Sequence, residues 1–508
     1  MSRLPYQCLS RLGQSSILCA AKGTSIHTFD LDAGSSLISS WTHPTTRQAS
    51  NETQEPKGHN EKESSQRPPK KRRLSSEKKS DPDGPPISAV SEAVEAAANG
   101  SGKKKPKPVQ RPELPFVTIL TATEDGSHVV AVTGQDKALW VFEHDGKGIL
   151  KEISSRIMPK RPSSIAVEEH SATILSADKF GDVYSLPLVP SAAPEPPPPQ
   201  ETAAPSAGSP APTVPFRPAA NRLTVHSKRN LRALEEQERS LSRRQEPRKE
   251  LPGFEHELIL GHVSMLTALA LAAGPDGRRY VVTGDRDEHV RVSRAAPQAH
   301  VVEGFCLGHG AFVNALCVPA ARPGVLLSAG GDDEVFVWDW RAARLVWKVD
   351  VLARVREVLP DATRIAVARL GSYDVGGRCY VLAICERVPA LFVLELLQDD
   401  APAYVQTLAV PGSPLDAVVV PRPEGPLRLV VAVHPPQSTA DDGEGHVTTA
   451  EEPQSLLFFD RDETGMWARQ GGIQDTADGN LDLSREELEN ILYPVGKLRK
   501  TEFEDDAE

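Results

Sequence analysis

Two stretches of the sequence carry carboxylates at spacings that could do chemistry. In ILSADKFGDVYSL, residues 174–186, Asp178 and Asp182 stand four residues apart between apolar runs, as in a catalytic or metal-binding carboxylate pair. The same spacing is typical of a tight turn between two β-strands, in which an aspartate accepts backbone hydrogen bonds. The stretch itself does not distinguish a site from a turn, so the elements around it must.

The second stretch is DGNLDLSREELE, which resembles an EF-hand calcium loop. Asp478, Asn480 and Asp482 occupy its first, third and fifth positions, and Glu489 occupies the twelfth. An EF-hand needs glycine at the sixth position for its sharp turn, and Leu483 stands there. Calcium binding is therefore the weaker interpretation.

The same residues fit the start of a helix better. Ser484 and Glu487 have the spacing of a capping box, and Leu483 and Leu488 that of a hydrophobic staple. The predicted helix carries an apolar stripe and ends near a proline; these residues are Leu488, Ile491, Leu492 and Pro494. We expect one convincing helix, near the C-terminal end.

No other enzyme signature appears in the sequence. It contains no P-loop, no dinucleotide-binding glycine loop, no nucleophile elbow, no H-E-x-x-H and no kinase signature, so we expect no cofactor and no catalytic residue. The six cysteines lack zinc spacing and resemble free thiols of an intracellular protein. No apolar run approaches 18 residues and no signal peptide is evident, so we expect a soluble protein without a membrane partner.

Two polar segments interrupt the apolar pattern. Residues 44–112 are rich in Pro, Ser, Lys and Glu, and residues 191–250 are Pro/Ala-rich and then charged. Neither has the apolar content that offsets the entropy of ordering a chain, so both are predicted to be disordered insertions. The net charge of −11 gives the chain no global positive field for nucleic acid.

The remaining short apolar runs, bounded by Gly, Asp and Pro, predict β-strands that repeat. Strand-turn-strand units align on Gly23, Asp136, Asp178, Asp287 and Asp332, which are 113, 42, 109 and 45 residues apart. Without the two polar segments, the separations of 113 and 109 become 44 and 49. A period of about 40–50 residues is typical of propeller blades with four strands each.

Further marks of WD repeats support this interpretation. LGH recurs at His262 and His309 ahead of a turn aspartate, and VWD ends one unit at Asp339. With two weaker units after residue 340 the count reaches seven. We therefore predict an all-β, seven-bladed WD-repeat β-propeller, in which Asp136, Asp178, Asp287 and Asp332 are structural turn residues.

The predicted organisation has six parts. Residues 1–43 form the first propeller strands, 113–190 and 251–470 form further blades, and 471–508 form a C-terminal segment with a short helix and an acidic tail. The two insertions, 44–112 and 191–250, lie between these parts.

The strand EHVRVS carries a candidate binding site for a protein partner. Strand alternation places His289 and Arg291 on one face and Val290 on the other, and Arg286 in the preceding turn joins the basic pair. Such a patch suits an acidic partner surface, although basic residues on a blade are as often only a solvated face. Because Arg291 points away from the valine face, its reversal to glutamate is expected to leave the fold intact.

A basic cluster in the first insertion fits a nuclear localisation signal. RPPKKRRL contains Lys70, Lys71, Arg72 and Arg73, and KKKPK follows from residue 103. The alternatives are a solubilising charge run or a nonspecific RNA tether. We expect a nuclear protein.

Several stretches resemble one particular family. SADKFGDVYSLPL, YVVTGDRDEHVRVSR and VEGFCLGHGAFVNALC are similar to the non-catalytic WD-repeat subunit of the eukaryotic tRNA (guanine-N7)-methyltransferase, in its fungal form. The resemblance implies a propeller that binds and stabilises a separate S-adenosylmethionine-dependent methyltransferase, which modifies a guanine in the variable loop of tRNA. It also implies partner contacts at Arg286, His289 and Arg291, with His289 replacing the lysine of some relatives.

A different function is compatible with the same fold. A general WD-repeat scaffold, in ribosome assembly or as a ubiquitin ligase adaptor, would share the blades and bind other clients. A hydrolase propeller with a carboxylate site in its channel has no supporting set of residues in this sequence.

Overall fold

The structure is a computed structural model in which the described residues are 4–32, 34–47, 114–168, 172–190, 253–423, 425–435, 454–474 and 483–500. The predicted insertions 191–250 and 44–112, the latter apart from a helical turn at 44–47, lie outside the described residues. The same holds for Lys70, Lys71, Arg72 and Arg73, and for the acidic tail after Lys500.

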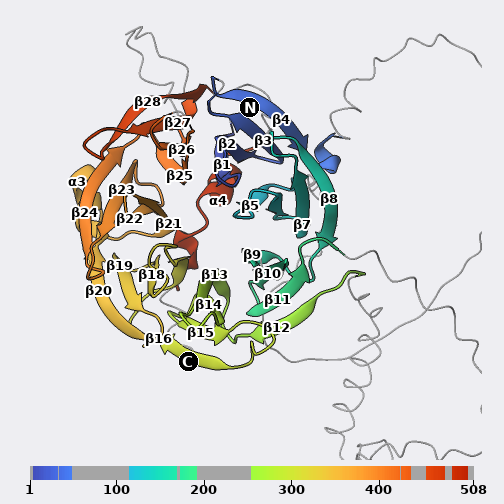
Figure 1. Ribbon diagram of the computed structural model, residues 1–508, viewed down its shortest axis with the longest axis vertical. Coiled ribbons are helices and arrows are strands. Elements are labelled where there is room, and N and C mark those ends of the chain that lie inside the picture. The colour runs from blue at the N-terminus through green and yellow to red at the C-terminus, as the bar shows by residue number, and fades with distance from the viewer. Residues whose placement is uncertain are drawn as a thin grey trace, which may run out of the picture. The chain divides into compact units, whose positions relative to one another are not determined.

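In the described ranges the strands form seven four-stranded antiparallel sheets, each built from four consecutive strands (Figure 1). Blade 1 comprises β1 (Tyr6–Arg11), β2 (Ile17–Lys22), β3 (Ser25–Asp30) and β4 (Ser36–Thr42). Blade 2 comprises β5 (Val117–Ala122), β6 (His128–Thr133), β7 (Ala138–His144) and β8 (Leu150–Ile157). Blade 3 comprises β9 (Pro162–Glu168), β10 (Thr173–Asp178), β11 (Asp182–Pro187) and β12 (Glu257–Gly261). Blade 4 comprises β13 (Leu266–Ala273), β14 (Arg279–Asp285), β15 (Val290–Arg294) and β16 (Val302–Cys306).

Blades 5 and 6 follow without a long interruption, and blade 7 is interrupted between its second and third strands. Blade 5 comprises β17 (Val313–Cys317), β18 (Val325–Gly330), β19 (Glu334–Asp339) and β20 (Arg344–Asp350). Blade 6 comprises β21 (Val367–Val375), β22 (Arg378–Cys385), β23 (Ala390–Leu396) and β24 (Pro402–Ala409). Blade 7 comprises β25 (Ser413–Val420), β26 (Arg428–His434), β27 (Gln454–Arg461) and β28 (Trp467–Gln474). The predicted seven-bladed propeller is confirmed.

The core lies between blades rather than within them. The second strands β2 and β18 are buried at every residue, because each is covered on both faces by neighbouring blades. One cluster joins Val282 and Val292 of blade 4 to Leu326 and Trp338 of blade 5. Packing of successive blades therefore holds the ring together.

The ring closes between blades 1 and 7 through side chains. First strands β1 and β25 lie in contact, and the backbone N–H of Leu9 donates to the Asp416 carboxylate over 2.8 Å. On the same seam the Arg422 guanidinium pairs with Asp32 at 3.0 Å. Because each sheet uses four consecutive strands, no strand is exchanged across this seam.

In the described ranges two α-helices of eight residues each accompany the strands. Helix α4 (Arg485–Leu492) has the predicted capping box, and Leu488 packs with Leu4 and Phe116, so the predicted C-terminal helix is confirmed. Helix α3 (Val351–Val358) was not predicted; the Asp350 carboxylate caps it by accepting from the N–H of Ala353. A 3-10 turn, η2 (Gly496–Leu498), follows α4.

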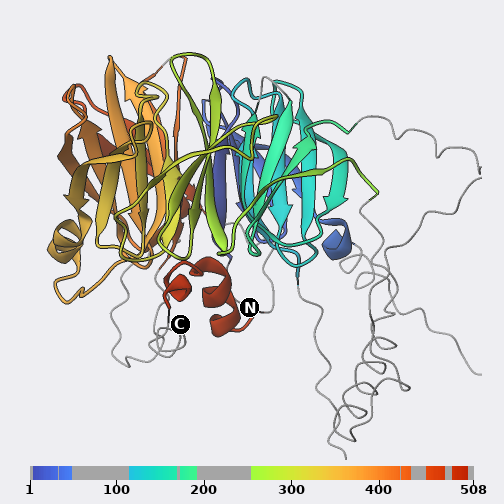
Figure 2. The ribbon, with the colours of Figure 1, turned by 90° about the horizontal axis from the view of Figure 1, so that it is seen from below.

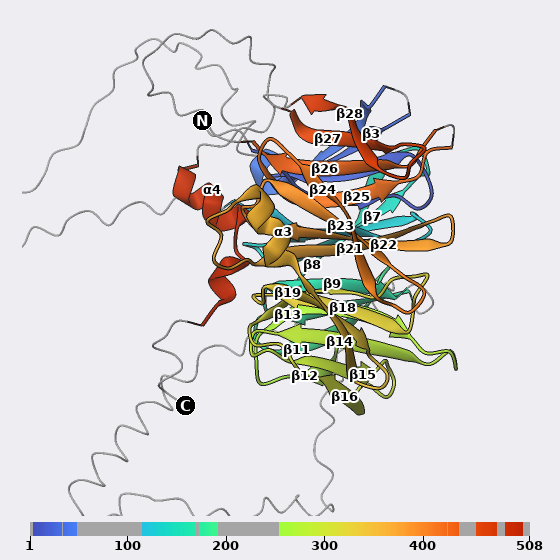
Figure 3. The ribbon, with the colours of Figure 1, turned by 90° about the vertical axis from the view of Figure 1, so that its left-hand side faces the viewer.

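The C-terminal segment, residues 483–500, crosses one face of the ring, as Figures 2 and 3 show for α4. The Glu386 carboxylate in the β22–β23 turn accepts from the N–H groups of Val495 and Gly496 at 2.9 and 2.7 Å. Glu489 pairs with Arg387 at 3.3 Å and thus has a structural role, whereas Asp478, Asn480 and Asp482 of the EF-hand-like stretch lie outside the described ranges. Turns between second and third strands therefore form the face that this segment covers.

Candidate protein-docking surface

The turn aspartate of blade 5 belongs to a buried chain of four polar side chains. Nδ1 of His309 lies 2.6 Å from Oδ2 of Asp332, and its Nε2 lies 2.6 Å from the Ser328 hydroxyl. The Trp338 indole donates to that hydroxyl at 2.8 Å. Although burial acts to raise it, the pKa of Asp332 is lowered by its hydrogen bonds from His309 and a backbone N–H. Asp332 is an architectural residue.

Blade 2 contains a corresponding set around Asp136. The Thr133 hydroxyl donates to Oδ1 of Asp136 at 2.6 Å, and the Trp140 indole donates to Thr133 at 3.1 Å. Nε2 of His43 lies 3.0 Å from Oδ2 of Asp136. His43 escaped the sequence analysis because residues 44–112 separate it from the blade that it completes.

Asp178 is a turn residue, which answers the question raised by its spacing from Asp182. Its Oδ1 accepts from the N–H of Phe180 at 2.7 Å and of Asp182 at 3.1 Å. Its side chain is buried, and this burial raises the pKa of the carboxyl. The described residues contain no group of three or more His, Cys, Asp or Glu that could hold a metal ion.

In blade 4 the corresponding role falls to Asp285 and not to the predicted Asp287. Oδ1 of Asp285 accepts from the N–H groups of Asp287 and His289, both at 2.9 Å. A carboxylate must stand at the start of the turn to reach the N–H groups two and four residues on. Asp287 lies past that point and pairs with Lys500 at 3.3 Å.

The predicted basic residues occupy three different environments. Arg286 donates from Nε to the carbonyl of Leu498 at 2.9 Å, so it contacts the C-terminal segment. The His289 ring is half-exposed, and its Nδ1 lies 3.4 Å from the Asp285 carboxylate. These two residues flank the β14–β15 turn on the face crossed by residues 483–500.

Arg291 connects two blades. It donates from Nη1 to the carbonyl of Gly261 on β12 at 3.0 Å and from Nε to the buried Ser293 hydroxyl at 2.9 Å. Partial burial lowers the pKa of its guanidinium. Arg291 thus ties β15 to the outer strand of blade 3, so charge reversal is expected to lower stability, and the expectation that the fold stays intact remains a prediction. Strand β15 is itself the third strand of its sheet, inside β16.

A group of exposed apolar side chains, which the sequence did not reveal, lies around these residues. Phe180 is 63% exposed in the β10–β11 turn, Val263 is fully exposed in the next loop, and Leu307 is 62% exposed after β16. The N–H of His262 donates to the carbonyl of Gly181 at 2.8 Å, which holds the turn of Phe180 against the loop of Val263. We call this group, with its neighbouring cations, the blade 3–4 surface; it comprises Phe180, Val263, Phe305, Leu307, Lys160, Lys179, Arg286, His289 and Arg291.

Polar and cationic side chains contact the exposed rings at each end of the blade 3–4 surface. The ammonium of Lys160 lies 3.9 Å from the centre of the Phe180 ring, a cation–π contact. Partial burial and the neighbouring Arg161 lower the pKa of Lys179. At the other end, the rings of His289 and Phe305 lie edge to face at 6.5 Å. Cations therefore border an apolar strip that runs across two adjacent blades.

His262 lies beneath this strip as a neutral side chain. Its Nε2 lies 3.1 Å from the Thr283 hydroxyl. Burial, with the charges of Arg291 and His289, lowers the pKa of His262 to about 4. The surface thus rests on a support that is uncharged at neutral pH.

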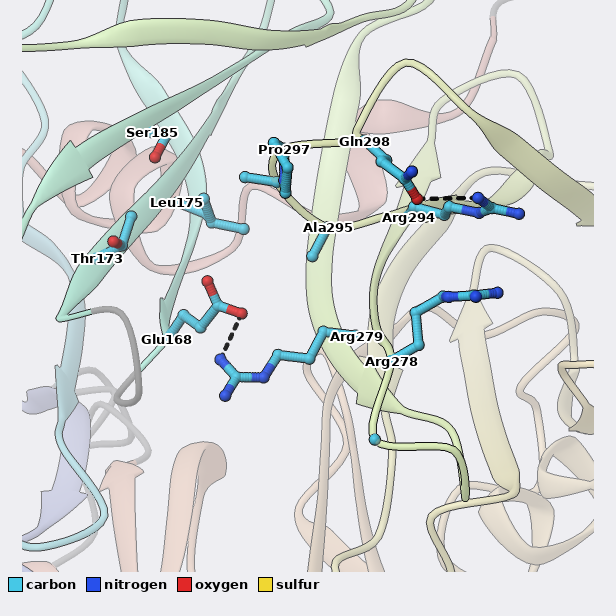
Figure 4. A pocket seen from close by; sticks show the side chains of 12 residues that line it. Glu168, Thr173, Leu175, Ser185, Arg278, Arg279, Arg294, Ala295, Pro297 and Gln298 are labelled. Atoms are coloured by element: carbon cyan, nitrogen blue, oxygen red, sulfur yellow. Dashed lines mark hydrogen bonds and ion pairs between the residues drawn. The ribbon is translucent and has the colours of Figure 1, made fainter.

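A cavity of about 560 Å³ also lies between blades 3 and 4, lined from β9, β10 and the β15–β16 loop (Figure 4). Arg279 points to Glu168 at 2.7 Å, and Arg294 turns to Gln298 at 2.9 Å. The blade 3–4 surface, which also exposes large apolar side chains, is the better candidate for binding a protein.

Comparison with known proteins identifies the family. The family described as the tRNA methyltransferase TRM82 WD40 domain matches residues 18–459. The chain belongs to this family. It is 38% identical over 526 residues to the tRNA (guanine-N(7)-)-methyltransferase non-catalytic subunit trm82 of Sclerotinia sclerotiorum, with 99% of each chain covered. Subunits of the same name from Aspergillus oryzae and Coccidioides immitis are 34% and 36% identical, with 99% and 95% of each chain covered.

Within the described residues, no helix is both long and apolar enough to cross a membrane. The family resemblance drawn from the sequence is confirmed.

Proposed function

We propose that this protein is the non-catalytic subunit of a tRNA (guanine-N7)-methyltransferase, which binds and stabilises the catalytic subunit that forms N7-methylguanosine in tRNA. The observation that carries this proposal is the similarity to non-catalytic subunits over 95–99% of the chain. The partner supplies the S-adenosylmethionine site and the methyl transfer, and tRNA binds to the complex.

The blade 3–4 surface docks the catalytic subunit. Protein interfaces place large apolar side chains at the centre and arginine or other polar groups around them. Phe180, Val263 and Leu307 form such a centre, and Lys160 and His289 lie beside it. The complementary partner surface has an apolar centre and an acidic border.

The complex works in the nucleus. The cluster Lys70, Lys71, Arg72 and Arg73 supports this part of the proposal, since basic runs of this kind are read as nuclear import signals. A fluorescent fusion of the full chain is expected in the nucleus. Substitution of these four residues by alanine should redistribute it, and an unchanged distribution would contradict the import role.

Co-expression with the catalytic subunit tests the main proposal. We expect the two chains to co-purify in equal amounts, and tRNA methylation, measured by mass spectrometry of nucleosides, to require both. The purified chain itself should show no S-adenosylmethionine binding by calorimetry. Co-purification of ribosomal precursors or a ubiquitin ligase in place of a methyltransferase would support the general scaffold instead.

A further inference from the structure

The cavity between blades 3 and 4 lies at the opposite end of these blades from the β14–β15 turn. Strand β14 begins at Arg279, which lines the cavity, and ends at Asp285, in the turn that carries His289. A strand of 7 residues spans about 20 Å, so the cavity and that turn are well separated. The cavity is therefore a second candidate site, independent of the blade 3–4 surface.

The size and the lining of this cavity suit a small ligand. Its volume of about 560 Å³ falls within the range of about 300–1,000 Å³ that is typical of small-molecule sites. Leu175, Ala295 and Pro297 form its apolar wall, and Thr173 and Ser185 add hydroxyl groups (Figure 4). Small-molecule sites commonly combine an apolar wall with a few polar groups that orient the ligand.

Arginine side chains outnumber carboxylates in the lining. Three guanidinium groups, those of Arg278, Arg279 and Arg294, line the cavity together with one carboxylate, that of Glu168. Arg294 is already engaged, because it donates to the Glu303 carboxylate on β16. The side chain of Arg278 is half-exposed and lies 4.0 Å from the carboxylate of a neighbouring aspartate. The lining therefore favours a ligand that carries negative charge.

Arg279 is held in position while most of its donors stay unused. Its side chain reaches from β14 to β9, where Nη1 donates to the Glu168 carboxylate at 2.7 Å (Figure 4). Within the described ranges the guanidinium makes no other hydrogen bond. Nε and Nη2 thus remain, and they carry two parallel N–H groups of the kind that bind a carboxylate or a phosphate bidentately. The geometry of Arg279 is therefore that of an anion-binding fork.

We propose that this cavity binds a small oxyanionic ligand, in which a phosphate or carboxylate group is attached to an apolar body. The oxyanion is bound by Nε and Nη2 of Arg279, and the body packs on the apolar wall. Glu168 is a positioning residue, since it holds the guanidinium across the gap between the two blades. The Ser185 hydroxyl, which makes no hydrogen bond within the described ranges, donates to the ligand. This site does not depend on the docking of a catalytic subunit.

Four probes test the class of ligand on the full chain. They are phenyl phosphate, benzoate, inorganic phosphate and the uncharged benzyl alcohol, each titrated by calorimetry up to about 10 mM. We expect phenyl phosphate or benzoate to bind with a Kd of about 1 mM or lower, and the tighter of the two decides between phosphate and carboxylate. Inorganic phosphate should bind more weakly because it leaves the apolar wall uncovered, and benzyl alcohol should not bind. Absence of binding by all charged probes, or equal binding of benzyl alcohol, would overturn the proposal.

Hydrogen exchange locates the bound probe on the natural chain. The tighter-binding probe should slow exchange at residues 277–280 and 295–298, which line or adjoin the cavity. Residues 286–289, at the other end of β14, serve as the reference and should exchange at an unchanged rate. Protection of the reference segment in place of the cavity segments would assign the probe to a different site and refute the proposal.

Substitutions then identify the groups that bind the oxyanion. Arg279→Gln should weaken binding of the tighter probe about 10- to 100-fold, as expected for hydrogen bonds to a charged group, and Arg279→Lys should weaken it less. Ser185→Ala leaves the pair of Arg279 and Glu168 intact and should weaken binding about 2- to 10-fold, so the proposal can still be judged if Arg279→Gln fails to fold. Arg344→Gln, at an exposed arginine on β20, is the matched control and should bind as the natural chain does. Unchanged affinity in both Arg279→Gln and Ser185→Ala would exclude the site.

Discussion

Phe180 provides the sharpest test of the docking surface. Its ring stands at the tip of the β10–β11 turn and contacts the ammonium of Lys160, but most of its area faces solvent. Substitution by alanine keeps the backbone, because the turn is held by the Asp178 carboxylate through main-chain N–H groups. The variant therefore removes one exposed ring and leaves the turn in place.

The expected loss of binding free energy follows from the exposed area of Phe180. A phenylalanine can bury about 150–250 Å², and the 63% of Phe180 that is exposed leaves about 95–160 Å² for a partner. At about 25 cal/mol per Å², covering that area stabilises a complex by about 2–4 kcal/mol. Alanine retains part of this contact, so we expect a loss of about 2–3 kcal/mol, or roughly 30- to 150-fold in Kd.

The assay compares Phe180→Ala with a matched control on the outer strand of blade 5. Trp347 on β20 is also an exposed aromatic, at 42%, and Trp347→Ala should leave partner binding unchanged. Affinity for the catalytic subunit is measured by calorimetry at moderate salt, and each propeller is melted separately. Both variants should unfold within about 0.5 kcal/mol of the natural chain, as surface substitutions usually do.

Two results would refute this reasoning. Binding of Phe180→Ala within twofold of the natural chain would mean that the ring stays in solvent in the complex. A matching loss with Trp347→Ala would mean that the assay reports general hydrophobicity and not docking on blades 3 and 4.

Three further outcomes follow from the described contacts. Arg291→Glu should lower partner affinity. It should also lower the free energy of unfolding, measured in denaturant, by about 1–3 kcal/mol, because it breaks the hydrogen bond to the Gly261 carbonyl. Unchanged stability would make Arg291 a purely binding residue. Glu386→Ala should cost about 2–3 kcal/mol of stability by leaving two N–H groups of the C-terminal segment without their acceptor, and Glu386→Gln should cost less; equal melts would exclude that anchor. Because the folded pKa of His262 is lowered to about 4, the unfolded chain binds more protons between pH 6.5 and 4. Stability should fall as pH falls through that range, and a His262→Gln variant should show a shallower fall; parallel curves would show that other groups dominate.

Most of the fold could be predicted from the sequence because blade turns need a carboxylate at a defined place. Asp136, Asp178 and Asp332 lie in such turns, and their spacing gives the period once the polar segments are set aside. The period could not choose between Asp285 and Asp287, because both lie in one turn and blade turns carry their aspartate at either place: Asp178 corresponds to Asp285, and Asp332 to Asp287. Local geometry alone makes that choice.

The docking surface was harder to predict, because exposure depends on which blades become neighbours. GFCLGH places Phe305 and Leu307 on the face opposite the buried Cys306, and apolar residues on both faces of an outer strand were an available signal. Phe180, an aromatic residue in a turn, was another. The apolar pattern of helix α3 was too short to predict a helix, because the helix is buried by residues of blades 5 and 6 and not by a long apolar stripe of its own.

Closure of the ring without strand exchange bears on how the protein is made. Were β1 needed to complete the last blade, it would wait as an unpaired edge while more than 400 residues emerged from the ribosome. Here each sheet is complete as soon as its fourth strand has been synthesised, so blades can form in order from the N-terminal side. The seam of Leu9, Asp32, Asp416 and Arg422 then joins two finished sheets. Residues 483–500 follow all seven blades and fasten blades 4 and 6, so a chain broken off earlier in translation lacks the element beside its docking surface.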